Sequence, residues 1–216
     1  CVRGVDDSVG RLRATLKELD LDDNTVVIYS SDQGFYIGDH GWYDKRWMYE
    51  ESLKMPFIVS WPGVTKSGSR DSHLIQNIDY AETFLEIAGA KIPADMQGRS
   101  LVPLLKGQSP KDWRTSIYYH YYEYPSFHMV PRHYGIRTER YKLMHFYRFG
   151  NEWEMYDLKN DPDELTNLYG KKGTAKLAAD LKKQLYSLQK HYGDESDTSA
   201  MPKEWQDKVR PGTAGK

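Results

Sequence analysis

Acidic, amide and basic side chains gather in one stretch broken by three glycines, SSDQGFYIGDHGWYDK, residues 30–45. Asp32 and Gln33 offer carboxylate and amide oxygens, hard ligands that suit Ca²⁺ or Mg²⁺ better than Zn²⁺. Lys45 adds a compact positive charge that can hold an anion. Glycines let such a loop turn tightly and approach a ligand closely. The stretch therefore predicts part of a cation and anion site, against the simpler reading of a polar surface loop.

The two oxygen ligands cannot form a metal site by themselves, because Ca²⁺ takes about six to eight oxygens. Further ligands must come from elsewhere in the protein. The only cysteine is Cys1, so the chain has no disulfide framework.

The stretch follows a segment typical of a buried strand. Residues 25–31, TVVIYSS, form a nearly continuous β-branched run, as in a parallel sheet covered on both faces. Apolar residues at steps of three and four across residues 2–19 predict an amphipathic helix before it. Ligands of open α/β sheets bind beyond the carboxyl ends of strands, which is where Asp32 and Gln33 lie.

The next segments continue an α/β pattern to about residue 108. Residues 55–63 read as a second strand and residues 73–79 as a short third strand. A helix follows, with Asp79 as its N-cap and Gly89 just past its end. Residues 98–107 read as a single helical turn. A sheet of so few parallel strands cannot cover itself, so this part looks like the second half of a larger domain.

An aromatic region comes next, in which 11 of the 33 residues from 117 to 149 are Tyr or Phe. Four segments within 115–158 predict short strands of an antiparallel sheet. Residues 174–192 predict an amphipathic helix with leucines along one side. The expected organisation is an α/β part at 1–108, a small sheet with a long helix at 109–195, and a polar tail at 196–216.

Charge and hydropathy exclude some partners. The formal net charge is -1, so no basic field argues for nucleic acid or for a membrane surface. No apolar run approaches the roughly 18 residues of a spanning helix, so we expect neither a nucleic-acid partner nor a membrane span.

Residues 25–63 resemble the C-terminal metal-and-sulfate segment of the type I sulfatases, in the alkaline phosphatase superfamily. The match lies in TVVIYSSDQGFYIGDHGWYDKRWMYEESLKMPFIVSWPG, and EMYDLKNDPDELTNLY resembles the signature near the family's C-terminal end. The resemblance extends from residue 1 to about residue 190. It implies the C-terminal part of an alkaline-phosphatase-like α/β sandwich, followed by the small four-stranded sheet and helix.

The resemblance implies roles for single residues. Asp32 and Gln33 match calcium-ligand positions, although Asn or His is commoner than Gln at the second. Lys45 matches the lysine that contacts sulfate oxygens and steadies charge on the leaving group. His40 matches a histidine that either contacts substrate or supports the loop. Residues 49–51 begin a segment that supports the loop.

The family's nucleophile is a formylglycine made from a C/S-x-P/A-x-R motif, and CVRGV at Cys1 does not match it. The resemblance therefore implies that the N-terminal half of the same sulfatase supplies the nucleophile and the other metal ligands. We expect residues 1–216 alone to lack sulfatase activity. The family also implies a periplasmic or secreted enzyme.

The aromatic sheet is the expected substrate surface. His120, His133 and Arg137 suit the carboxylates or sulfates of an acidic sugar, although sheet packing and ordinary surface positions are the plainer reading. The region resembles bacterial carbohydrate sulfatases, including those acting on 6-sulfated N-acetylglucosamine of heparan-type glycosaminoglycan. Two alternatives stay open: a phosphate or phosphonate ester hydrolase of the same superfamily, and a noncatalytic glycan-binding module.

Overall fold

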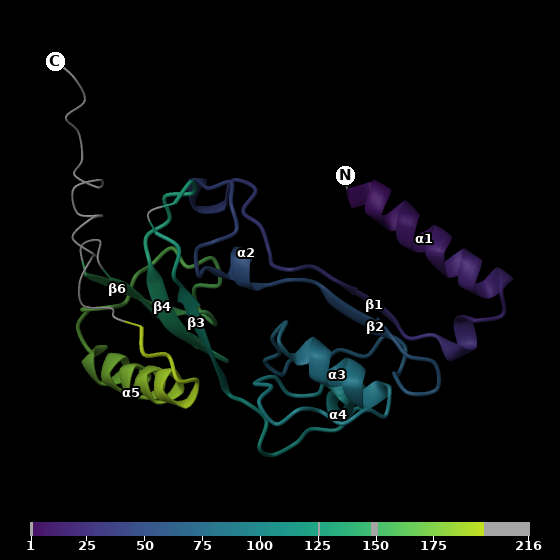
Figure 1. Cartoon of the computed structure of the whole chain (residues 1–216). Coiled ribbons are helices and arrows are strands. Elements are labelled where there is room, and N and C mark those ends of the chain that lie inside the picture. The colour runs from purple at the N-terminus through teal and green to yellow at the C-terminus, as the bar shows by residue number, and fades with distance from the viewer. Residues whose placement is uncertain (1, 125, 148–150, 197–216) are drawn as a thin grey trace. The chain divides into compact units, whose positions relative to one another are not determined.

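The computed structural model describes residues 2–124, 126–147 and 151–196 (Figure 1). The chain forms two compact units. The first unit combines residues 2–32 with 55–113, and the second combines 33–54 with the described part of 114–216. The division expected near residue 108 stays a prediction, and the polar tail from residue 197 onward lies outside the described residues.

The first unit contains most of the predicted α/β elements. These are α1 (Val2–Glu18), the 3₁₀-helix η1 (Asp22–Asn24), β1 (Val27–Ser30), β2 (Phe57–Ser60), α3 (Asp79–Ile87) and α4 (Val102–Leu105). Leu101, Leu104 and Trp113 form its small core. No side chain of α1 is buried, and Val2 and Leu12 are 85% and 67% exposed within the described chain.

The predicted strand direction in this unit is wrong. β1 and β2 pair antiparallel, with Val27 opposite Ser60 and Ser30 opposite Phe57. The predicted burial is not found either: within the described chain Tyr29 is exposed and the other three residues of β1 are half-buried. β-Branched residues favour a strand, but their composition alone does not fix the direction of its neighbour. Here the chain doubles back between the two strands, and β2 returns alongside β1.

The predicted third strand at residues 73–79 is also wrong, because the structure has a turn there. The Gln76 N–H donates to the Asp79 carboxylate at 2.7 Å, and the Asp79 N–H donates to the Gln76 carbonyl at 3.0 Å. Ile78, rather than Asp79, occupies the N-cap position of α3, and the Asp79 carboxylate also accepts the Arg99 N–H at 2.8 Å. Gly89 follows the helix at a φ of 68°, as predicted.

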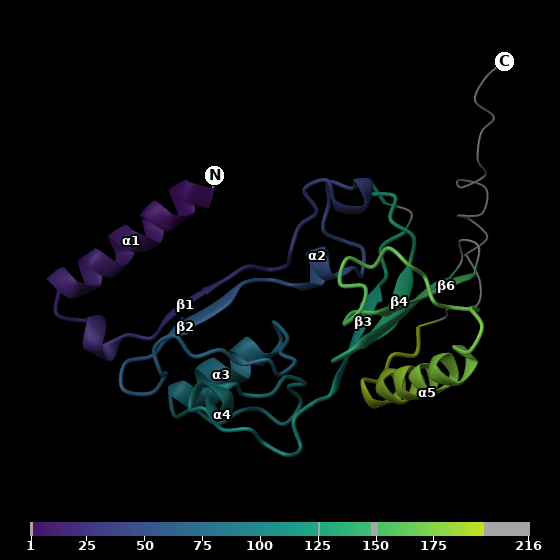
Figure 2. The same cartoon turned by 180° about the vertical axis from the view of Figure 1, so that it is seen from behind.

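The second unit confirms the predicted sheet and helix. Its strands are β3 (Ser116–Tyr121), β4 (His133–Thr138), β5 (Tyr141–Phe146) and β6 (Glu152–Asp157), and its helices are η2 (Asp39–Gly41), α2 (Glu50–Leu53) and α5 (Ala175–His191). The strands lie in sequence order, and each pair is antiparallel. Figures 1 and 2 show α5 along one face of this sheet and α2 on the other side.

Alternation of side chains along the strands gives the sheet two different faces. One face packs its apolar side chains against α5, with Ile136 and Leu143 against Leu185. The other face, with Met144 and Phe146, packs against the segment 33–54. No helix in the described part of the chain is both long and apolar enough to span a bilayer.

Candidate functional site

The segment 33–54, called the site loop below, is organised around the buried side chain of Ser52. Its hydroxyl donates to the Lys45 carbonyl at 2.5 Å and accepts a hydrogen bond from the Gln33 amide nitrogen at 3.0 Å. The Ser52 carbonyl accepts the Gly34 N–H at 2.8 Å. Ser52 is 0% exposed, so these bonds are shielded from water. One serine therefore brings together two predicted site residues that lie 12 positions apart.

Gly34 allows the two arms of the site loop to touch. A Cβ atom at this position would lie 1.9 Å from the Glu51 carbonyl oxygen and 2.6 Å from that of Lys54. Both atoms belong to the backbone of α2 or its end, so they cannot swing aside as a side chain would. The close approach therefore requires glycine.

Lys45 lies half-buried between two residues that pair with each other. The Asp44 carboxylate forms an ion pair with the Arg46 guanidinium and accepts the Lys45 backbone N–H at 2.7 Å. Asp44, the acidic neighbour of Lys45, is thereby paired with Arg46. A lysine on a loop fixed in this way can present its ammonium group to an anion.

Asp32 is the last residue of the first unit, and its side chain is exposed. Its backbone carbonyl lies 3.5 Å from the Asn77 amide nitrogen. In the second unit, the Gln33 amide nitrogen is directed at Ser52, so a metal would have to bind the amide oxygen. Carboxylate and amide oxygens fit Ca²⁺, or less well Mg²⁺. The described residues contain no group of three or more His, Cys, Asp or Glu able to hold a metal, so a complete site needs further ligands.

His40 supports the site loop through its ring. It lies in η2 with a φ of 53°, and its ring stacks on Tyr49 at a centroid distance of 4.4 Å. Its Nε2 atom lies 3.5 Å from a carboxylate oxygen of Glu51. These contacts favour the loop-supporting alternative, while substrate contact stays a prediction.

His120 lies on the α5 face of the sheet, opposite the face that packs on the site loop. Its Nδ1 is 2.5 Å from the Asp194 carboxylate, and its Nε2 is 2.7 Å from the Tyr147 hydroxyl. Burial lowers the pKa of His120, and the hydrogen bond with Asp194 opposes that effect. The structure therefore does not bring His120 to Lys45. The sequence could have indicated this placement, because side chains alternate along β3. His120 therefore shares a face with Tyr118, and Tyr119 lies on the other face.

His133 and Arg137 lie on the face that packs on the site loop, but both have partners within the protein. His133 is 0% exposed, and its Nδ1 donates to the Pro131 carbonyl at 2.7 Å. Burial lowers the pKa of His133 to about 4. Arg137 donates to both carboxylate oxygens of Glu50, at 3.3 and 3.0 Å. These positions favour the packing alternative, and substrate contact by either residue stays a prediction.

A buried group of charges beneath the site loop was not predicted as a unit. Lys142 lies 2.9 Å from a Glu50 carboxylate oxygen and 2.8 Å from one of Glu164. Burial alone would raise the pKa of Glu50, but the hydrogen bond from Arg137 and the charge of Lys142 lower it to about 2. Burial raises the pKa of Glu164, against the opposing charge of Lys142. An inward-facing lysine between apolar strand residues is the sequence signal that could have revealed the group.

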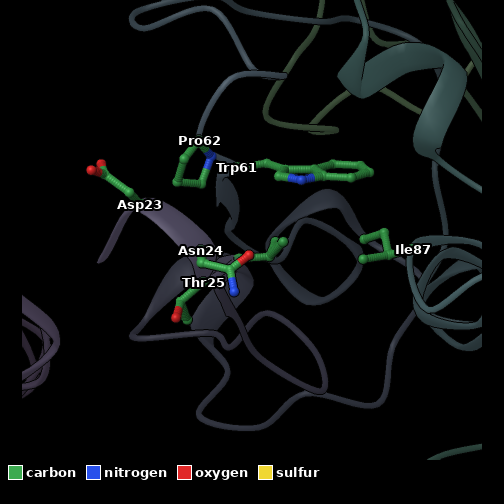
Figure 3. Close-up of a pocket in the computed structure, with 7 residues that line it drawn as sticks. Asp23, Asn24, Thr25, Trp61, Pro62 and Ile87 are labelled. Carbon is green, nitrogen blue, oxygen red and sulfur yellow. The ribbon is translucent and has the colours of Figure 1, made fainter. Parts of the chain in front are cut away.

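A separate cavity of about 240 Å³ lies in the first unit (Figure 3). It is lined by Asp23, Asn24, Thr25, Val26, Trp61, Pro62 and Ile87. None of these is a predicted site residue, and no lysine, arginine or histidine is among them. The cavity therefore lacks a cation that could hold a sulfate or phosphate group.

Comparisons with known proteins agree with the resemblance seen in the sequence. Residues 38–191 match the family described as N-sulphoglucosamine sulphohydrolase, C-terminal. An N-acetylglucosamine-6-O-sulfatase of Bacteroides thetaiotaomicron is 51% identical over 195 residues, which cover 89% of this chain and 35% of that protein.

Solved structures share the fold over most of the chain. One sulfated-sugar complex, described as holding its substrate D-glucosamine-2-N,6-O-disulfate, matches with a TM-score of 0.88 and 50% identity over 91% of this chain. A phosphonate monoester hydrolase of Agrobacterium radiobacter matches with a TM-score of 0.77 and 27% identity over 87% of this chain. The chain spans 40% and 39% of these two structures, respectively.

Proposed function

The chain belongs to the sulfatase family described as N-sulphoglucosamine sulphohydrolase, C-terminal, in the alkaline phosphatase superfamily, and we propose that it is the C-terminal part of a carbohydrate sulfatase. The proposed reaction is hydrolysis of the 6-O-sulfate ester of N-acetylglucosamine, as found in heparan-type glycosaminoglycan. The observation that carries the proposal is the 51% identity to an N-acetylglucosamine-6-O-sulfatase.

Within this proposal, Lys45 is a catalytic residue of the chain. Its ammonium group holds a sulfate oxygen and stabilises the negative charge that grows on the leaving oxygen as the S–O bond breaks. Ser52 fixes the backbone of Lys45, so the lysine side chain starts from a defined place in the loop. A charge held in place before the reaction costs little reorganisation in the transition state.

Asp32 and Gln33 would hold Ca²⁺ through their side-chain oxygens. When bound, Ca²⁺ withdraws charge from the sulfate oxygens and so makes the sulfur easier to attack. The N-terminal half of the protein would supply the formylglycine nucleophile and the other metal ligands. We place the enzyme in the periplasm or outside the cell.

The competing candidate is phosphate or phosphonate ester hydrolysis, which the structural match to a phosphonate monoester hydrolase favours. Both reactions would use Lys45 on an anionic group, so the loop alone does not separate them. The sulfated-sugar complex is 50% identical to this chain and the phosphonate monoester hydrolase 27%, so the sulfate ester is the preferred proposal.

The full-length protein should release sulfate from N-acetylglucosamine 6-O-sulfate. We expect kcat/KM for this ester to exceed that for N-acetylglucosamine 6-phosphate and for an aryl phosphonate monoester by about a hundredfold or more. Faster cleavage of either phosphorus ester would replace the proposal with the competing candidate. Sugar binding without turnover of any ester would indicate a glycan-binding module instead.

A further inference from the structure

We propose that a buried ionic cluster, defined as Glu50, Lys142, Glu164 and Arg137, positions the site loop for catalysis. The effect on rate rests on the proposed function, in which Lys45 contacts the sulfate. The cluster residues are positioning residues, since their contacts are with the loop and the sheet.

The cluster joins four parts of the second unit, with Arg137 coming from β4. Lys142 is the second residue of β5 and is 0% exposed. Its ammonium group lies within 2.9 Å of Glu50 in α2 and within 2.8 Å of Glu164, which follows β6. Glu164 also accepts the Glu50 backbone N–H at 2.7 Å. The first residue of α2 is therefore held by both its side chain and its backbone.

The path from the cluster to the proposed site is short and entirely bonded. α2 is a single turn of four residues that begins at Glu50 and contains Ser52. Ser52 holds the Lys45 carbonyl and the Gln33 amide, as described above. Gly34 packs directly on the α2 backbone. A shift of α2 would therefore move both arms of the site loop.

Charges suit this role better than apolar contacts would. An apolar side chain can slide against its neighbours, whereas an ammonium between two carboxylates has one favourable position. Paired buried charges often add little to stability compared with well-packed apolar residues. The Glu50 and Glu164 carboxylates face Lys142 and Arg137, and the Lys54 ammonium also lies 3.3 Å from Glu50. Removing a buried partner from such a group leaves the remaining buried charges uncompensated.

The test uses three variants of the full-length protein: Lys142→Met, Glu164→Gln and Ser52→Ala. The first removes the central charge, the second keeps side-chain size, and the third cuts the link to Lys45 without touching the cluster. Lys182→Met is the matched control, because Lys182 lies over the Trp153 ring on the α5 face of the same sheet. If Lys142→Met does not fold, the other two variants decide.

Hydrogen–deuterium exchange tests the anchoring itself, without relying on activity. We expect faster exchange in peptides from residues 33–54 in each variant, and unchanged exchange there in Lys182→Met. Unchanged exchange of the site loop in folded variants would overturn the inference.

Kinetic measurements in the parent protein and in Lys45→Ala protein test the coupling of the cluster to Lys45. We expect each variant to lower kcat/KM for the 6-O-sulfate by about tenfold to a hundredfold, since small misplacements cost this much. The same substitutions should have little further effect in Lys45→Ala protein, because residues acting through one another are not additive. Additive losses would overturn the positioning role. A Lys45→Ala protein with unchanged rate would instead refute the proposed function, and exchange would still decide the anchoring.

Discussion

At the scale of single residues, the second unit buries several polar side chains that have specific partners. His133 donates to a backbone carbonyl, Lys142 lies between two carboxylates, and His120 bonds Asp194 and Tyr147. Burying such groups without partners would cost several kcal/mol each. The residue types could be read from the sequence, but the partners could not, because Glu50 and Glu164 are 114 positions apart.

Burial of His133 should make stability depend on pH. Its pKa is lowered from 6.5 to about 4 in the folded protein, so the unfolded chain binds more protons between these values. Stability from this residue is therefore complete above pH 6.5 and declines as the pH falls toward 4. Between pH 7.5 and pH 5 the expected loss is about 2 kcal/mol.

The measurement is urea unfolding of the full-length protein at both pH values. His133→Gln keeps a donor for the Pro131 carbonyl but does not titrate, so it should be about 2 kcal/mol less sensitive to this pH change than the parent. Substitution of the exposed His191 by Gln serves as the control. Equal pH sensitivity in the parent and His133→Gln would show that His133 does not remain neutral when folded.

At the scale of elements, local patterns predicted most of the second unit and less of the first. β3 to β6 and α5 form where the alternation and the helical spacing indicate them. The antiparallel pairing of β1 with β2 depends on how residues 33–54 turn the chain back, which no periodicity records. Residues 73–79 have a strand-like composition but are held as a turn by the Asp79 carboxylate.

The candidate site shows the same limit. Composition and resemblance identified Asp32, Gln33 and Lys45, but not Ser52, which is a common loop residue by type. Its importance comes from bonds to two positions that the fold brings together. Position in the folded loop, rather than residue type, is what the sequence could not supply.

Gly34→Ala should damage the site loop as an element. The new Cβ would meet two backbone carbonyl oxygens of residues 51 and 54, so α2 would have to move. Overpacking of this kind costs about 1–3 kcal/mol. We expect lower kcat/KM as well as lower unfolding stability, because moving α2 displaces Ser52 and with it Lys45.

The control for this prediction is Gly170→Ala, also in the second unit. Its Cβ would meet nothing within 4 Å, but its φ of 75° makes alanine strained there. It should lose about 1–2 kcal/mol of stability and keep its kcat/KM. If both alanine variants keep kcat/KM, the close approach at Gly34 does not matter for the site.

At the scale of the whole molecule, the chain matches only part of its relatives. It covers 35% of the Bacteroides sulfatase and 40% of the substrate-bearing structure. Its first unit has a two-stranded sheet, and such a sheet is only marginally stable alone. We therefore assign the expected activity to the full-length protein, in which the N-terminal half would add the nucleophile and metal ligands.

Calcium should stabilise the full-length protein through Asp32. A ligand that binds only the folded state adds RT ln(1 + [L]/Kd), or about 2.7 kcal/mol at a hundred times Kd. We expect chelation to lower the unfolding stability of the parent protein and to abolish sulfate release.

Asp32→Ala removes one carboxylate ligand, so added Ca²⁺ should stabilise this variant much less at the same concentration. Asp23→Ala removes an exposed carboxylate from the same unit and should respond to Ca²⁺ like the parent. An equal calcium response in Asp32→Ala and the parent would exclude Asp32 as a ligand, even if the variant had lost activity.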